Sequence, residues 1–120
     1  MRFMTIYRPA GRKSLEADVP PTEEEMMKMG AFIEELSKAG VLLAADGLLS
    51  SKTGALVRQS NGSVTVTDGP FAESKELIGG FVILRVKSRA EAIEVTERFL
   101  KLAGDGECEV REMYDEPAAG

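Results

Sequence analysis

Two helix signatures of the same design stand out in the sequence. Glu25 follows Thr22 by three positions, and this is the spacing of a capping box, in which two side chains bond backbone groups at the start of a helix. Ser88 and Glu91 repeat the spacing. Apolar residues at helical intervals follow each box: Met26, Met29, Ile33 and Leu36 before Gly40, and Ala92, Ile93, Thr96, Phe99, Leu100 and Ala103 before Gly104. The patterns predict two amphipathic helices that end at these glycines.

Four further segments have strand patterns: residues 2–7, 41–45, 80–87 and 107–114. In the first, Phe3, Thr5 and Tyr7 share one face. Met4 and Ile6 share the other, so both faces carry apolar groups. The second is apolar throughout, which predicts a buried strand, and the third is apolar on both faces.

A hairpin is predicted between the second and third of these strands. Asn61-Gly62 is the preferred pair for a type I′ turn, and apolar and polar residues alternate on both sides of it. Such alternation is typical of strands with one face in water and the other buried. We therefore expect one face of this hairpin to be solvated.

The order strand, helix, strand, hairpin, strand, helix, strand predicts an α+β fold, a ferredoxin-like βαββαβ layout with an inserted β-hairpin. We expect one domain over residues 1–120, with a frayed tail at 115–120. Two helices cover only one face of a sheet, whereas these strands are apolar on both faces. A second copy of the chain is the simplest cover, so a homodimer is expected.

Composition narrows the classes of function. The 120 residues carry a formal charge of −5, which disfavours nucleic acid and anionic membrane surfaces as partners. The chain has no histidine, which excludes His-based acid/base catalysis and His metal ligands. Cys108 is the single cysteine, so no disulfide forms within the chain. Together with the lack of a signal or membrane pattern, this predicts a cytoplasmic location. No cofactor is predicted.

The segment 68–76 carries the candidate chemistry, because a rigid turn precedes several carboxylates. Pro70 fixes its own φ, Gly69 is free to take a positive φ, and the Asp68 side chain can accept backbone N–H bonds. One interpretation is a turn needed only for folding. The other is a cleft for a small molecule, with its candidate ligand-binding residues being Asp68, Gly69, Pro70, Phe71, Glu73 and Tyr7.

Catalysis, if present, needs a carboxylate as general base, for which Asp68 and Glu73 are the candidates. Tyr7 and Arg111 are candidate assisting residues, although an arginine in a strand is more often part of a structural ion pair. Oxygen ligands alone suit Mg²⁺ or Ca²⁺ better than zinc, but the ligand set is sparse and no metal site is predicted. Acidic neighbours raise the pKa of a thiol, so Cys108 is a poor nucleophile candidate.

The run Asp68-Gly69-Pro70-Phe71, continued to residue 81 and joined with residues 39–43, resembles the YCII-related family in its DGPF subgroup. The resemblance implies a dimeric α+β barrel, in which two sheets pack face to face. Some members outside the subgroup are thought to use a histidine on the first helix with an aspartate, and the relatives include enzymes that act on small aromatic compounds. Met29 falls near that histidine position, so the resemblance carries over fold and dimerisation without the His-Asp chemistry.

Three hypotheses follow for the function. The first is a homodimer that binds a small molecule beside the Asp68 turn. The second is a small enzyme that uses Asp68 or Glu73 as general base. The third is a protein-interaction or scaffold domain associated with regulation.

Overall fold

The computed structural model describes residues 1–10, 20–70 and 78–115. The elements are β1 (Arg2–Pro9), α2 (Glu23–Lys38), β2 (Leu42–Gly47), the 3₁₀ turn η1 (Ser51–Thr53), β3 (Ala55–Ser60), β4 (Ser63–Asp68), β5 (Gly80–Arg85), α3 (Arg89–Ala103) and β6 (Gly106–Glu112). Within the described ranges, no helix is long and apolar enough to cross a membrane. Phe71 and Glu73 lie outside them.

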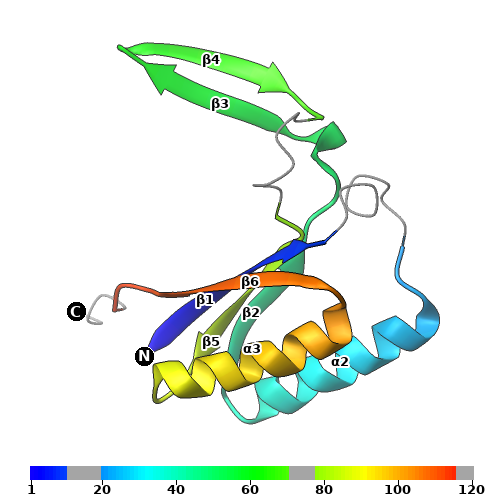
Figure 1. The fold of residues 1–120 in the computed structure, drawn as a ribbon. Helices are drawn as coiled ribbons and strands as arrows, with labels where there is room; N and C mark the ends of the chain where they lie inside the picture. Colours follow the sequence, from blue (N-terminus) through cyan, green and yellow to red (C-terminus); the bar gives the residue numbers. More distant parts are fainter. Residues whose placement is uncertain (11–19, 71–77, 116–120) are drawn as a thin grey trace.

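The sheet has the strand order β2-β5-β1-β6, and every neighbouring pair is antiparallel. Both helices lie on one face of it (Figure 1). This is the order of a ferredoxin-like βαββαβ fold, and the two-stranded β3–β4 sheet is inserted between its second and third strands. The predicted fold class, α+β with an inserted hairpin, is confirmed.

The core lies between the sheet and the helices, and it follows from the alternation of the strands. Phe3 and Thr5 of β1 point at the helices and are buried, as are Val82 and Leu84 of β5. The helices contribute Phe32, Leu36, Ala92 and Val95 to the same cluster, and Val86, just after β5, completes it. The opposite face of the sheet, which we call the open face, is covered by neither of the two described helices (Figure 1).

Both helices begin at the predicted cap residues, but only the first predicted capping box is complete. The Thr22 hydroxyl accepts from the Glu25 N–H at 3.1 Å and the Glu25 carboxylate accepts from the Thr22 N–H at 3.2 Å, which completes a capping box. At α3 the Ser88 hydroxyl accepts from the Glu91 N–H, but the Glu91 carboxylate accepts from the Lys87 N–H, one residue earlier than a capping box requires. In each helix, the cap side chain therefore satisfies the N–H of the third helical residue.

Three details differ from the sequence expectation. The stripe of α2 that is buried contains Phe32 and Leu36, whereas Met26 is 57% exposed. The run at 41–45 forms an edge strand without a fully buried residue, because β2 pairs only with β5. Every residue of β3 and β4 is exposed, so the hairpin has two solvated faces instead of one.

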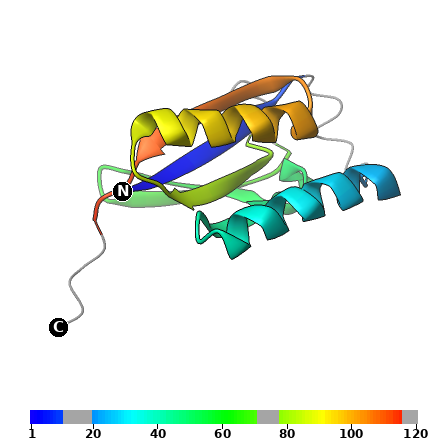
Figure 2. The ribbon, with the colours of Figure 1, turned by 90° about the horizontal axis from the view of Figure 1, so that it is seen from below.

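The turn of the hairpin is as predicted. Asn61 has φ of 52° and Gly62 of 80°, the positive values that a type I′ turn requires. The hairpin projects from the end of β2 on the side of the sheet opposite to the helices, as the two views show (Figures 1 and 2). It is therefore on the same side as the open face.

Candidate functional site

An apolar groove with a volume of about 490 Å³ lies between the first half of α2 and the end of α3. Its lining residues are Pro21, Glu25, Met26, Met29, Gly30, Ile33, Leu102 and Ala103. The volume is within the range of small-molecule sites, which are mostly apolar with a few polar groups.

The groove exists because α2 starts beyond the point where α3 ends. Figure 2 shows the first turns of α2 extending past the last turn of α3. Phe32 and Leu36, in the second half of α2, are covered, whereas Met29 is only half-buried and Met26 is exposed. The apolar stripe of α2 is thus partly uncovered at its start.

Gly30 lies in the wall of this groove, in the interior of α2. A Cβ built at Gly30 meets no atom within 4 Å, and the residue has no positive φ. Neither packing nor backbone conformation therefore requires glycine here, although glycine inside a helix is destabilising by roughly 0.5–1 kcal/mol relative to alanine. Any larger side chain at this position would occupy the groove.

The polar groups near the groove are few and already bonded. Glu25 belongs to the capping box of α2. The Tyr7 hydroxyl lies 3.4 Å from the carbonyl oxygens of Ala103 and Gly104 and 3.3 Å from that of Asp105. It can donate to one of these carbonyls at a time, so Tyr7 caps the end of α3 behind the groove wall.

Tyr7 is fixed in this place by the core. Its ring packs edge-on against Phe99 with the centroids 5.5 Å apart. Burial, followed by the nearby charges of Cys108 and Asp105, raises the pKa of Tyr7, so the hydroxyl keeps its proton. Burial, followed by the charge of Glu107, raises the pKa of Cys108 to about 11, which agrees with the expectation that this thiol is a poor nucleophile.

Asp68 lies elsewhere, at the foot of the hairpin. It is the last residue of β4, it is exposed, and it stands opposite Ala55. Gly69 donates its N–H to the Gly54 carbonyl at 3.0 Å and is not among the residues with positive φ, and the Gly69–Pro70 peptide is cis. Asp68 and Tyr7, which the sequence hypothesis joined in one cleft, thus belong to two separate sheets.

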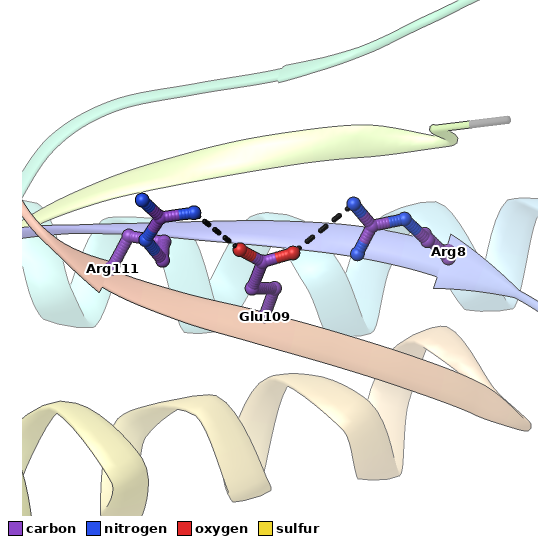
Figure 3. Close-up of polar contacts among 3 residues, drawn as sticks. All are labelled: Arg8, Glu109 and Arg111. Carbon is purple, nitrogen blue, oxygen red and sulfur yellow. Dashed lines mark hydrogen bonds and ion pairs between the residues drawn. The ribbon is translucent and has the colours of Figure 1, made fainter. Parts of the chain in front are cut away.

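Arg111 is part of an ion pair on the open face. Its Nη1 lies 2.7 Å from Glu109 Oε2, and Arg8 Nη2 lies 3.2 Å from Glu109 Oε1 (Figure 3). The hydrogen bonds from Arg111 and then Arg8 lower the pKa of Glu109. This is the structural ion pair that the sequence offered as the alternative to an assisting role for Arg111.

The centre of the open face is apolar. Met4 stands opposite Ile83, and Ile6 stands opposite Phe81, with all four side chains half-buried. Arg111 and Glu109 are their neighbours on β6. The face thus has an apolar centre with charged groups beside it.

Sequence reasoning missed the groove, although Gly30 within a helical pattern was a signal for it. Met29, which stands near the histidine position of some family members, lines the groove. Across residues 1–10, 20–70 and 78–115, no three acidic or cysteine side chains gather in a way that would hold a metal ion.

Three comparisons place the chain among known proteins. The family model described as YCII-related domain matches residues 1–116. An uncharacterized protein of Rhizobium meliloti (strain 1021), R00369, is 35% identical over 72 residues, which are 60% of this chain and 58% of that protein. This region is therefore less than two thirds of that relative's length.

The third comparison concerns a solved structure. It is the 5-chloro-2-hydroxyhydroquinone dehydrochlorinase TftG from Burkholderia phenoliruptrix AC1100, in complex with 2,5-dihydroxybenzoquinone. The TM-score is 0.55 at 18% identity, with 97% of this chain and 96% of that chain covered. At this identity the likeness concerns the fold.

Proposed function

The chain belongs to the YCII-related family, and we propose that it is a homodimer that binds a small, largely apolar molecule in the groove between α2 and α3. Cytoplasmic location is part of the proposal, supported by the single cysteine.

Gly30 is the observation that carries the proposal. The residue weakens α2, and the fold offers no reason for it, since a Cβ there would meet open space. A ligand in the groove supplies the reason, because it would occupy the space that a side chain would fill. Proteins commonly accept lower stability at sites that function needs.

The lining indicates the class of ligand. Met26, Met29 and Ile33 offer flexible apolar contacts, and thioethers make favourable contacts with aromatic rings. TftG, which shares the fold, was solved with a small ring compound. A small aromatic molecule is therefore the ligand class that we propose.

The open face supports dimerisation. An apolar centre with charged groups at its edge is the usual arrangement of a protein interface. Met4, Ile6, Phe81 and Ile83 form that centre, and two sheets commonly pack through such faces about 10 Å apart. Packing open face to open face would bury all four side chains twice.

A native mass spectrum of the protein gently purified from its own cells tests both parts, because it reports subunit count and retained small molecules together. We expect a dimer with added mass. Gly30→Leu should lose the added mass and remain a dimer. Ala31→Leu places the same side chain at an exposed neighbour outside the groove lining and should keep the added mass. Retention of the ligand by Gly30→Leu would contradict the site.

The cleft beside the Asp68 turn stays a second proposal, with Asp68 or Glu73 as general base and Tyr7 or Arg111 assisting. The exposed Asp68 carboxylate supports it, since that carboxylate is open to a ligand. Once a substrate is known, Asp68→Asn should lower turnover if Asp68 is the base, and unchanged turnover would remove this assignment. If the protein is instead a scaffold, Asp68→Asn should change only the stability of the fold, which the urea midpoint measures.

A further inference from the structure

We infer that the β3–β4 hairpin, residues 55–68, is an arm that packs on a second copy of this chain through one of its two faces. The inference rests on the homodimer proposed above. It adds that the arm is part of the interface and that the free subunit leaves this surface without cover.

The two faces of the arm differ in chemistry. The pairing of Val57 with Val66 and of Gln59 with Val64 places three valines on one face, which we call the valine face. Arg58 is paired with Thr65 and Leu56 with Thr67 on the other face. Side chains alternate strictly along a strand, so a single substitution affects only one of the faces.

The valine face lies in water in the single chain. Val57 is 63% exposed, Val64 59% and Val66 65%. Of the eleven exposed large apolar side chains in the described ranges, four belong to the arm, and three of these, the valines, share this face. Contiguous exposure of this kind marks an interaction surface, whereas isolated exposed apolar residues are ordinary.

Within the described ranges, the arm also has little support from its own chain. β3 and β4 contact mainly each other, and all twelve of their residues are exposed. A lone two-stranded hairpin is at best marginally stable in water. Its unpaired edges and apolar face would also promote aggregation unless a partner covers them.

A second copy is the occupant that the arrangement favours. The arm projects on the side of the sheet opposite to the helices (Figures 1 and 2), so it shares that side with the open face. A copy seated on Met4, Ile6, Phe81 and Ile83 therefore approaches the arm as well. Arg58 and Asp68 are the charged residues of the arm and cancel one another, which disfavours nucleic acid or an anionic membrane.

The dissociation constant of the dimer, measured by analytical ultracentrifugation, tests the inference. Val66→Lys places a charge on the valine face, and Thr65→Lys places the same charge on the opposite face of the same strand. We expect Val66→Lys to raise the dissociation constant about a hundredfold, since twofold symmetry introduces the change twice. Thr65→Lys should raise it less than about threefold.

Hydrogen exchange guards against variants that fold poorly, since it uses the wild-type chain. Amides of the arm should be protected at concentrations where the dimer forms and should lose protection on dilution, while those of β1 and β5 stay protected. The role of the arm would be overturned, with the homodimer left intact, by two results together. Val66→Lys and Thr65→Lys would change the dissociation constant equally, and the arm amides of the wild-type dimer would be unprotected. A wild-type monomer at micromolar concentration would overturn both.

Discussion

A buried pair of hydroxyls provides a quantitative test of how α3 is held on the sheet. Thr5 of β1 is 1% exposed and Thr96 of α3 is 6% exposed, and their Oγ1 atoms lie 3.0 Å apart. The pair joins the central strand to the helix whose end carries Leu102 and Ala103 of the groove. Changing either threonine to valine keeps the shape but leaves the other hydroxyl without this bond.

The two changes should differ in size. A buried hydroxyl left unsatisfied costs about 1–3 kcal/mol. After Thr5→Val, Thr96 can turn towards the carbonyl four residues before it in the helix, so we expect a loss of about 1 kcal/mol. After Thr96→Val, Thr5 lies in a strand paired on both sides, where backbone groups are engaged, so we expect about 2 kcal/mol.

The double variant is the decisive measurement. With both hydroxyls gone the site becomes apolar, and the loss should be below about 1 kcal/mol, which gives a coupling free energy of about 2 kcal/mol. Urea titrations measure the loss of stability in the two single variants and the double variant. They are done at one fixed protein concentration, because dimerisation would make stability depend on concentration. Additive losses in the double variant would refute the bond. Thr67→Val, at an exposed position of the arm, is the control and should change stability by less than about 0.5 kcal/mol.

Two further predictions concern backbone packing and ionisation. A Cβ on Gly80 would lie 2.8 Å from the Asp46 carbonyl oxygen, so Gly80→Ala should lower the free energy of unfolding by about 1–3 kcal/mol. Gly30→Ala should instead raise the free energy of unfolding by about 0.5–1 kcal/mol, and urea titrations measure both changes. The thiol pKa of Cys108 is about 11 in the folded chain, above its value of about 8.5 in unfolded chains, so the stability it contributes is full below pH 8.5 and is lost as pH rises towards 11. Urea midpoints between pH 8 and 11 should therefore fall less for Cys108→Ala than for the wild type, and equal slopes would contradict the shift.

Local chemistry explains what could be predicted from the sequence. Asn61-Gly62 specifies its turn through the positive φ of both residues, and Thr22 specifies the start of α2 through its own hydrogen bond. Strand alternation likewise predicted that Phe3 and Thr5 share one face of β1, and the structure buries both of them. Each of these signals involves residues close in sequence, so the chain carries it without tertiary context.

Tertiary placement explains what could not be predicted. Helical spacing marked Met26 as a core residue, but burial of α2 depends on where α3 ends, so Phe32 is buried in its place and Met26 lines the groove. Alternation in the hairpin predicted one buried face. The structure of the single chain exposes both, because the period of a strand does not tell which part of the chain, or which other molecule, covers its apolar face.

The signature that resembles the DGPF subgroup is described over residues 68–70, which lie at the foot of the arm. Asp68 forms the last rung of the hairpin with Ala55, and the Gly69 N–H bonds the Gly54 carbonyl. A Cβ on Gly69 would collide with the Ser51 carbonyl oxygen, so close packing against η1, and not a positive φ, requires glycine there. The turn thereby fixes where the arm leaves the body. If the arm binds a second copy, this signature serves assembly even where it binds no ligand.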